Sequence, residues 1–572
     1  ASEINGLGQN SFRIFDTTEI LAGEVFMKRY YDFIVQCADK KVECFLNNQV
    51  IDNKRPDYGS LINDFLDVKP TVYLCTTAVS AYFNPKSRYY QNALVYKRIS
   101  LALDFITKFQ RDDGSFDLAS CNFKSAPDTA FIIKRMSYTY KLIKKYDVNG
   151  SFKLIEDKIC GIICSAVNAL VSGGFHTPNH RWAIAAALAA CSNIVSDDSV
   201  KQRCLNRINE YFVEPVDSME NGEYSERSSG NYNAVVNAAM IMLYEELNNS
   251  EFLEYVDKNL EFMLMMIDAD GTIFTENSLR QDRGRREYAV KYFYQYLFMA
   301  HKSKNNAGVF SSAAHKIIRD AVERHDYSVD CLYILMVYEW MADIELGESA
   351  LPYEYNKYFP YSGLARVKKG DITYSLLNND ENFLFFQNGS VRLGMRIVVN
   401  YFQHRHFKAE KIERSSNGYI LKFKADGWYY LPFTEPPGTK DWWEMDNSSR
   451  ELLVNSNTEF AVEVIDVDAG IDIIIKTSGI DRIPVRVEIS LPAGGKIYSD
   501  NFVLETNDGN WMILKNGELR YVKNSTSLTI SGGFCAHEFI QGGYSGGPER
   551  LGYTVFMTDY TNFERRISIR AK

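Results

Sequence analysis

The sequence has no excess of basic charge, and this absence excludes one class of partner. It holds 64 Lys and Arg against 73 Asp and Glu, which gives a formal net charge of -9. Binding to the backbone of a nucleic acid favours a basic protein face. The densest basic stretch, Arg280 to Arg286, is interrupted by Asp282. We therefore expect no nucleic-acid partner.

Long apolar runs are also missing. A helix needs about 20 apolar residues to span a bilayer, whereas the longest candidate, Ala183 to Cys191, has nine residues and is typical of a buried helix. We expect no membrane partner. The sequence opens at Ala1 without the charged and then apolar segment of a secretory signal, so we expect a cytoplasmic protein, or a secreted or periplasmic one whose signal has been removed.

Closely paired cysteines are absent as well. None of the ten Cys forms a Cys-x-x-Cys pair, so neither a zinc finger nor a thioredoxin-type motif is expected. Cys160, Cys164 and Cys191 lie within apolar helical patterns, where a free Cys behaves as a small hydrophobe. The pattern predicts reduced, buried thiols, which favours an intracellular location.

Aromatic residues, in contrast, are abundant. The chain has 35 Phe, 37 Tyr and 6 Trp. Tyr and Trp combine an apolar face with a polar edge, which suits sugar rings as well as protein interiors and interfaces. The apolar fraction of 46% supports a sizeable core, and the 572 residues alone would allow roughly four domains.

Residues 1 to about 345 have the period of helices. Apolar residues recur at steps of three and four in Leu94 to Phe109, Ala130 to Tyr146, Phe152 to Val171, Trp182 to Ile194, Ala234 to Leu247 and Glu251 to Met266. Short polar connections separate many of these segments, as between antiparallel helices. Similar turns with a Gly recur at 112–117, 221–226 and 270–276 without a fixed period. The pattern predicts helical hairpins that close into a toroid, with the similar loops lining one mouth.

Beyond the segment Leu346 to Pro360 the period changes to two. Strand patterns occur at Asp371 to Leu377, Phe383 to Gln387, Ile471 to Lys476, Val485 to Leu491 and Ser527 to Ser531. These patterns predict an antiparallel β-sandwich. The expected fold class is therefore α+β with two domains: an (α/α) toroid, or incomplete barrel, over residues 1–350 and the sandwich over residues 351–572.

The first segment with chemically capable residues begins a helix. Thr177 and Pro178 have the chemistry of an N-cap and first helical position. Asn179 and His180 then fall in the first turn, where the helix dipole keeps an imidazole neutral and able to accept a proton. Trp182 follows as a candidate for sugar contact. An ordinary capped helix with a solvent-facing first turn would explain the same residues.

The second and third segments also precede or join helices. Tyr232 acts as a general acid or base only if a nearby cation lowers its pKa of about 10, and Arg227 is close in sequence. A polar loop around a core Tyr is the alternative. The third segment, residues 275–284, contains Arg280 and Arg283, whose guanidinium groups can grip a carboxylate with two hydrogen bonds. With Glu226 and Asp282, these arginines are candidate sugar-binding residues or parts of an ion-paired structural loop.

The fourth segment is an expected strand in the second domain. Alternation puts His404 and His406 on the same face. Such a pair could contribute to a zinc site, but a third ligand is needed and none is obvious nearby. We expect no cofactor, and an edge that faces a partner or the active site explains the pair equally well.

With these segments the chain resembles the heparinase II/III-like superfamily of polysaccharide lyases and related glucuronidases. Those proteins have an incomplete helical toroid followed by an antiparallel β-sandwich. Asn179 and His180 look like the family's Asn-His pair, and Tyr232 lies 52 residues after His180, near the family's proton-transferring Tyr. His404 and His406 resemble its His-x-His segment. The resemblance covers nearly the whole chain but is carried by short motifs.

The resemblance implies β-elimination. Asn179, together with an Arg or His such as Arg227 or His406, would neutralise the carboxylate of a substrate uronate. His180 or Tyr232 would remove the C5 proton, and Tyr232 would protonate the leaving oxygen at C4, which leaves an unsaturated uronate. Fixed donors must stabilise the charge that develops on the carboxylate.

One departure and two alternatives accompany this interpretation. Where the lyases usually place an Asp that completes a metal site, this chain continues with residues 407–409, Phe-Lys-Ala, so zinc is not favoured. Four acids, Glu223, Glu226, Glu276 and Asp282, could serve an exo-acting glucuronidase, since a glycosidase needs two carboxyl groups about 5–10 Å apart. A non-catalytic protein that binds acidic glycans is the second alternative. The sandwich edges and the aromatic surplus also suggest a homodimer.

Overall fold

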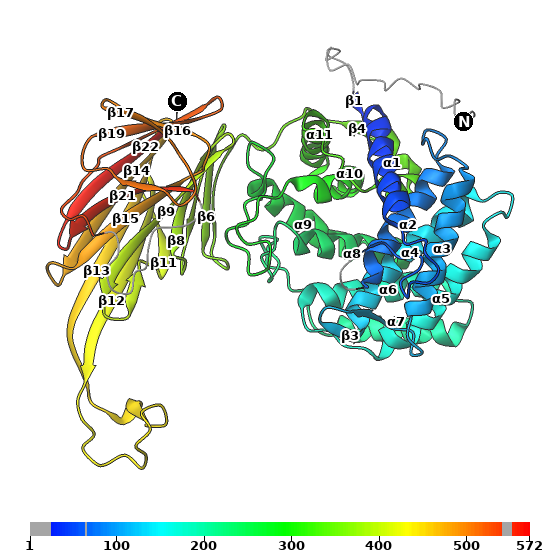
Figure 1. Cartoon of the computed structure of the whole chain (residues 1–572), viewed down its shortest axis with the longest axis horizontal. Helices are drawn as coiled ribbons and strands as arrows, with labels where there is room; N and C mark the ends of the chain where they lie inside the picture. Colours follow the sequence, from blue (N-terminus) through cyan, green and yellow to red (C-terminus); the bar gives the residue numbers. More distant parts are fainter. Residues whose placement is uncertain (1–24, 63–65, 540–551, 572) are drawn as a thin grey trace.

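The computed structural model describes residues 25–62, 66–539 and 552–571. Figure 1 shows two lobes, a helical lobe formed by the first part of the chain and a lobe of strands formed by the second. The last helical turn of the first lobe ends at Asp343, and the first strand of the large sheets begins at Glu354. This arrangement confirms the predicted fold class.

The helical lobe is built from hairpins. Its helices are α1 (Tyr31–Asn48), α2 (Val68–Phe83), α3 (Ala93–Phe109), α4 (Ala126–Tyr146), α5 (Lys153–Ser172), α6 (Pro178–Ile194), α7 (Asp198–Tyr211), α8 (Tyr232–Leu247), α9 (Glu251–Met266), α10 (Phe293–Lys302), α11 (Ala307–Glu323) and α12 (Leu332–Val337). Two small two-stranded sheets belong to this lobe: β1 (Val25–Phe26) pairs with β4 (Glu345–Leu346), and β2 (Phe116–Leu118) pairs with β3 (Asn122–Ser125) as a hairpin. In the inner layer, α2, α4, α6 and α8 pack against one another in turn. The outer helices α3, α5, α7 and α9 each pack on the preceding inner helix, and α12 closes against α2 and α4.

The sequence of α6 explains its central position. Its residues from Arg181 to Ser192 are all buried, and most of them are small. A helix that is apolar all round must be surrounded by protein, and α6 packs against α4, α5, α7 and α8. Close packing also explains the glycines in the recurrent turns. Gly114 and Gly222 have positive φ angles, and a Cβ at these positions would lie only 1.8 and 2.1 Å from backbone carbonyl oxygens of the neighbouring helices.

The second lobe consists of two large sheets packed face to face. One contains β5 (Glu354–Phe359), β6 (Leu364–Lys369), β7 (Ile372–Leu377), β8 (Asn382–Asn388), β9 (Val391–Tyr401), β10 (His404–His406), β15 (Pro484–Leu491), β18 (Trp511–Ile513) and β21 (Tyr553–Tyr560). The other contains β11 (Lys411–Ser415), β12 (Gly418–Tyr430), β13 (Leu452–Val467), β14 (Gly470–Gly479), β16 (Lys496–Ser499), β17 (Phe502–Glu505), β19 (Glu518–Lys523), β20 (Thr526–Ser531) and β22 (Glu564–Ala571). Among the strands that the structure describes, β18 pairs with β21 in parallel and the other pairs are antiparallel. In Figure 1, β12 and β13 extend beyond the sandwich as a long hairpin.

The sheet that contains β6 and β8 lies between the toroid and the second sheet. Residues along both strands are buried on both faces, and those of β6 include the charged side chains of Arg366 and Lys368. Phe359 and Phe385 join the toroid core and contact Phe262 and Phe274 at ring-centroid distances of 5.1 and 5.6 Å. The two lobes therefore share an apolar interface.

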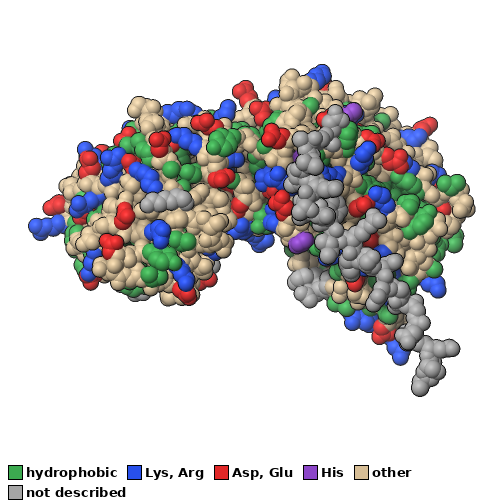
Figure 2. Space-filling model, turned by 90° about the horizontal axis from the view of Figure 1, so that it is seen from above, with side chains coloured by type: hydrophobic (Ala, Val, Ile, Leu, Met, Phe, Trp, Pro, Cys, Tyr) green, Lys and Arg blue, Asp and Glu red, His purple; other side chains and the backbone are tan. Residues whose placement is uncertain are grey.

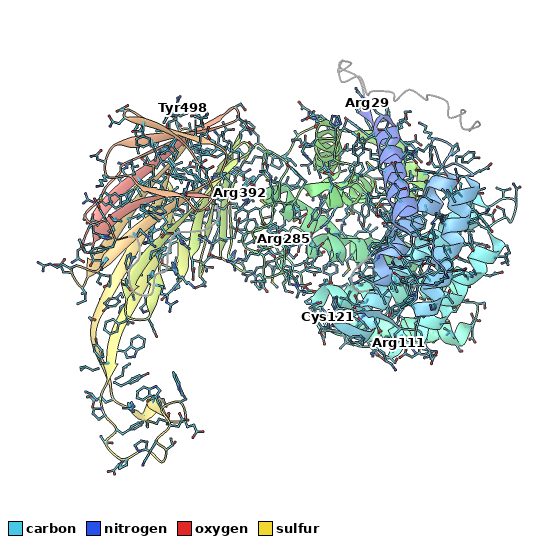
Figure 3. All side chains as sticks on the ribbon, in the orientation of Figure 1. Arg29, Arg111, Cys121, Arg285, Arg392 and Tyr498 are labelled. Carbon is cyan, nitrogen blue, oxygen red and sulfur yellow. The ribbon has the colours of Figure 1, made fainter. Side chains whose placement is uncertain are left out.

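A buried ionic cluster fixes the same interface. Asp268, in the turn after α9, accepts hydrogen bonds from Arg366 on β6 at 2.7 Å and from Arg392 on β9 at 2.8 Å. Asp268 and Arg366 are each 1% exposed in their side chains. Arg366 also donates to the carbonyl oxygen of Met265 and to the hydroxyl of Ser375. Figure 3 shows Arg392 at the junction of the two lobes.

Two expectations about buried segments have different outcomes. The ten cysteines are free, and Cys191 is buried, but Cys164 is exposed and Cys160 is partly exposed because both lie toward the outer face of α5. The prediction that all three are buried is therefore wrong for two of them. None of the helices that the structure describes is long and apolar enough to cross a bilayer.

Candidate active site

The N-terminus of α6 is capped by a carboxylate from a distant loop. Thr177 is the N-cap residue, as predicted, but its side chain makes no capping hydrogen bond. Instead, the backbone N–H of Asn179 donates to Oε2 of Glu226 at 3.0 Å. An anion is favoured at this end of a helix dipole, so Glu226 occupies the position that an acidic ligand would otherwise favour.

The side chain of Asn179 also binds Glu226, and it is buried. Its Nδ2 donates to Oε2 and Oε1 of Glu226 at 2.7 and 3.0 Å and to the hydroxyl of Thr177 at 3.2 Å. The residue is 0% exposed. The expectation that Asn179 presents donors to a uronate is therefore not met, because its donors are already engaged. It positions Glu226, and burial raises the pKa of that carboxyl although Asn179 and Arg280 oppose the shift.

His180 lies at the edge of this cluster with its ring partly exposed. Its ring meets His176 edge to face, with the centroids 4.7 Å apart, and it contacts Phe131 at 6.0 Å. Burial and, to a smaller extent, the proximity of His176 lower the pKa of His180 to about 4. The imidazole is therefore neutral at pH 7 and can accept a proton, as the sequence predicts for this position.

Tyr232 is the first residue of α8. The cation beside its ring is Arg280, and not Arg227 as predicted. The guanidinium of Arg280 lies 4.8 Å from the centre of the Tyr232 ring, and one of its nitrogens lies 3.4 Å from Oε1 of Glu226. The Tyr232 hydroxyl donates to Oε1 of Gln281 at 3.3 Å. Arg280 thereby joins the start of α6 to the start of α8 through contacts with Glu226 and Tyr232.

Arg227 does not take the role predicted for it. Its guanidinium donates to the backbone carbonyl oxygens of Tyr361 at 3.1 Å and Ser362 at 3.5 Å and lies 5.2 Å from the centre of the Tyr361 ring. The positive φ of 51° at Arg227 turns the loop in this direction. Arg227 therefore joins the toroid to the start of the sandwich.

Two further candidates are structural. Trp182 is 0% exposed and donates its indole N–H to Asp217 at 2.8 Å, so it cannot stack on a sugar. Asp282 is 5% exposed and accepts hydrogen bonds from Ser228, Gly230 and Ser278 at 2.6 to 2.9 Å. It holds the loop before α8 against the loop that carries Arg280. Glu226, at 7% exposed, likewise acts on its protein neighbours.

The remaining candidates lie toward the sandwich. Arg283 forms an ion pair with Asp380, in the turn between β7 and β8. The next residue, Glu381, lies 3.4 Å from Nδ1 of His406 and 3.0 Å from the ammonium of Lys408. His406 therefore lies on the sandwich side of the junction, and burial lowers its pKa.

His404 and His406 do not form a matched pair. The register against β9 shifts between them, which ends the strict alternation that the sequence suggested. His404 lies 3.2 Å from the carbonyl oxygen of Asp426 and contacts the ring of Phe423, whereas His406 faces Glu381. Among the residues that the structure describes, no group of three His, Cys, Asp or Glu is arranged to hold a metal ion. The two histidines thus face different neighbours.

Sequence reasoning missed the inner wall of the site. Lys69 on α2 pairs with Asp128 in the first turn of α4 at 2.7 Å. Phe131, one turn further along α4, contacts His180. These residues lie inside segments with a helical apolar pattern, and the Asp128 position at a helix start is the only sequence signal they offer.

Figure 2 shows Lys and Arg side chains mixed with Asp and Glu side chains over the face of the molecule that it draws. With a net charge of -9, the overall field does not attract an acidic ligand, so any attraction must come from single groups such as Arg280.

Comparisons with known proteins identify the fold. No protein-family model matches the chain, and no curated protein matches it. A solved heparinase III superposes with a TM-score of 0.52 at 10% identity, covering 94% of this chain and 84% of that one. A chondroitin AC lyase variant from Streptomyces coelicolor superposes with a TM-score of 0.53 at 10% identity, covering 95% and 82%. The chain has the fold of these lyases. The same lyase in complex with chondroitin sulphate gives a TM-score of 0.52 over 95% of this chain and 80% of that one.

The cluster lies where the start of α6 and the start of α8 meet, beside the sandwich. The N-termini of α6 and α8 open at the same mouth of the toroid, and the loops before α8 contact the sandwich through Arg227 and Arg283. His180, Tyr232 and Arg280 are the members of the cluster that keep accessible surface.

Proposed function

We propose that the protein cleaves uronic-acid-containing glycans or oligosaccharides by β-elimination. One observation carries this proposal: Arg280 lies over the Tyr232 ring, pairs with Glu226 beside Asn179, and is near enough to lower the pKa of His180. A fixed cation, a neutral base and a phenol are the three groups that the reaction needs. The shared fold with lyases supports the same conclusion.

Arg280 is the group that we assign to the substrate carboxylate. Its side chain is 24% exposed, and its guanidinium contacts Glu226 and the Tyr232 ring. Removal of the C5 proton pushes charge onto the uronate carboxylate, and a fixed guanidinium stabilises that charge. In this arrangement Arg280 replaces Asn179 as the neutralising donor.

His180 and Tyr232 divide the proton transfers between them. Neutral His180 takes the C5 proton, the electron pair forms the C4–C5 double bond, and the bond between C4 and the leaving oxygen breaks. The Tyr232 hydroxyl gives its proton to that oxygen, and the phenolate regains a proton from the His180 imidazolium or from water. A bound carboxylate raises the pKa of His180 from its low value and so makes it a stronger base.

The hydrolytic alternative is supported less well, because the four acids are engaged within the protein. Asp282 and Glu223 are 5% and 1% exposed. Glu226 is bound by Asn179 and Arg280, and Glu276 lies 3.7 Å from a nitrogen of Arg392. A glycosidase needs two carboxyl groups that reach the substrate.

The test incubates the purified protein with a panel of uronic-acid glycans and follows two signals. We expect ultraviolet absorbance of an unsaturated uronate to rise in step with new reducing ends on at least one glycan. New reducing ends without that absorbance would favour the glucuronidase, and binding without either signal would favour a non-catalytic glycan-binding protein.

Tyr232→Phe tests the assigned acid with a matched control. The substitution removes only the hydroxyl, so we expect elimination to fall by at least about a hundredfold, within the range for loss of a general acid. Tyr498→Phe makes the same change on β16, far from the toroid (Figure 3), and should leave turnover unchanged. Equal rates for the two variants would remove Tyr232 from the mechanism.

A further inference from the structure

The β12–β13 hairpin extends from the sandwich as an arm (Figure 1). β11 pairs with β12 as far as Lys422, and β14 pairs with β13 as far as Thr458. Beyond these positions β12 and β13 continue to Tyr430 and Leu452. We call residues 431–451, which connect the two strands, the arm tip. A two-stranded ribbon by itself is only marginally stable in water, so contacts with a partner would stabilise the outer part of the arm.

The arm tip is folded by its own contacts and presents one large apolar side chain to solvent. The guanidinium of Arg450 lies 3.9 Å from the centre of the Phe433 ring and 4.8 Å from that of the Trp442 ring. Asp441 accepts a hydrogen bond from the backbone N–H of Trp443 at 2.9 Å. Trp443 itself is 89% exposed. A Trp that an ordered loop holds in solvent is typical of the residues that anchor protein interfaces.

The charge of the arm tip restricts what it can bind. The tip contains five exposed acids and two bases, namely Glu435, Asp441, Glu444, Asp446 and Glu451 against Lys440 and Arg450. This excess of negative charge disfavours an acidic glycan and favours a surface that carries lysines or arginines. The expected site for Trp443 is therefore an apolar pocket with basic side chains around it.

The toroid has a pocket of this kind. Its volume is about 380 Å³, and its lining includes three lysines of α4 and three largely apolar side chains, namely Lys141, Lys144, Lys145, Tyr140, Ile194 and Val337. Pockets of about 300–1,000 Å³ hold groups as large as a drug molecule, so this volume admits an indole ring. We call it the lysine pocket.

The lysine pocket lies at the end of the toroid away from the sandwich. Ile194 is the last residue of α6, whose first turn lies at the candidate site, and Lys144 and Lys145 are in the last turn of α4. The 17 residues of α6 span about 25 Å. None of the described residues of the arm lines this pocket. An arm tip that fills it therefore comes from a second copy of the chain.

Lys144 is the lysine of the pocket that is freest to bind a partner. Lys141 pairs with Glu246, an acid of the same lining that is 4% exposed. Lys145 donates to two backbone carbonyl oxygens at 3.0 and 3.1 Å. The Lys144 side chain is 55% exposed and pairs with Glu156 at 3.5 Å. Ion pairs of exposed side chains contribute about 0–1 kcal/mol, so Lys144 can turn toward a carboxylate of the arm tip at little cost.

We propose that two copies of this chain associate through the arm, with Trp443 of one copy in the lysine pocket of the other. The indole ring packs on the apolar side chains of the pocket, and Glu444, next to Trp443 in the sequence, lies toward Lys144. Reciprocal exchange of the two arms closes a two-fold dimer. This association gives the arm the partner that a lone ribbon lacks, and it is independent of the reaction proposed above.

The test measures the molar mass of the full chain by light scattering over a wide range of protein concentration. We expect a dimer at the higher concentrations. Trp443→Ser should raise the Kd of the dimer by about 30-fold or more, as the loss of an interface anchor does. Lys144→Glu should raise it by about tenfold or more, because like charges then meet. A protein that stays monomeric at every concentration would overturn the proposal.

Two control variants make the same changes elsewhere on the sandwich. Trp511 on β18 is 39% exposed and Lys476 on β14 is 65% exposed, and Trp511→Ser and Lys476→Glu should leave the Kd of the dimer unchanged. Because Trp443 is so exposed, Trp443→Ser should also leave the free energy of unfolding unchanged. A dimer that Trp443→Ser and Lys144→Glu do not weaken would overturn the proposal.

A mixing experiment tests whether the arm and the pocket meet. In a mixture of Trp443→Ser and Lys144→Glu proteins, each mixed pair has one intact arm tip and one intact lysine pocket that can meet. Mixed dimers should therefore form at lower concentrations than dimers of either variant alone. Mixed dimers no tighter than those of the two variants would overturn the proposal.

A cross-linking measurement locates the contact directly. Trp443 is replaced by the photoreactive residue p-benzoylphenylalanine, and this protein is irradiated together with isotope-labelled copies of the natural chain. Mass spectrometry should find cross-links between the two isotopic forms that join position 443 to peptides containing residues 140–145 or 194. Cross-links to other surfaces alone would overturn the proposal. An unchanged molar mass in Trp443→Ser, together with weaker binding of a neutral oligosaccharide, would overturn it as well and would assign the arm to a glycan.

Discussion

Replacement of Asp268 should weaken the junction between the toroid and the sandwich strongly. In Asp268→Asn the guanidinium of Arg366, 1% exposed, loses its charge partner, and Arg392 loses one as well. Breaking a buried ion pair by removing one partner costs about 3–5 kcal/mol, because the remaining charge stays desolvated. The hydrogen bonds of Arg366 to Met265 and Ser375 remain, so we expect a loss near the lower end of that range.

The assay is urea unfolding, followed by tryptophan fluorescence and by hydrogen exchange of the amides in β6 and β9. Asp32→Asn is the matched control, since Asp32 pairs with Lys86 at 2.7 Å but both side chains are more than half exposed, and such pairs contribute about 0–1 kcal/mol. Adding Arg366→Met to Asp268→Asn should recover part of the loss, because it removes the unpaired charge. An Asp268→Asn protein as stable as Asp32→Asn would refute this reasoning.

Three further predictions concern the candidate site and Lys134 on α4. Glu226→Gln removes the negative charge that contacts Asn179 and Arg280. The kcat should fall by about tenfold or more, with little change in the free energy of unfolding. An unchanged kcat would contradict the assigned geometry. Because His180 must be neutral to accept a proton, kcat/KM should hold as the pH falls from 7 and be lost near its pKa of about 4; an acid limb near 6.5 would contradict this. Burial lowers the pKa of Lys134 from the usual 10.5 to about 8, so the charged lysine destabilises the folded protein below pH 8. Lys134→Met should therefore raise the free energy of unfolding by at most about 3 kcal/mol below pH 8, and this gain should vanish as the pH rises to 10.5. Unfolding curves at pH 7 and 10.5 measure the difference, and equal stability of the two proteins at pH 7 would contradict the prediction.

The sequence predicted the long regular elements well. The expected helix at 94–109 is α3 (Ala93–Phe109), and the expected strand at 485–491 is β15 (Pro484–Leu491). These segments carry a strong apolar period because packing buries one face. Other elements were not predicted: α12 has only six residues, too few to show a clear period, and β12 was missed although its burial alternates along the strand.

The candidate site was predicted in its segments and not in its contacts. His180 and Tyr232 do lie at helix starts on the same mouth, as local capping and turn patterns suggested. The cation over Tyr232 is Arg280 and not Arg227, because loop geometry and not sequence distance decides which guanidinium reaches the ring.

The most direct test of the proposed reaction is the mass of its products. A defined oligosaccharide with one internal uronate is incubated with the protein, and both fragments are weighed by mass spectrometry. Elimination breaks the bond between C4 and oxygen without adding water, so the fragment masses should sum to the mass of the substrate. A sum larger by one water molecule would identify hydrolysis and contradict the assignment of His180, Tyr232 and Arg280 to a lyase mechanism.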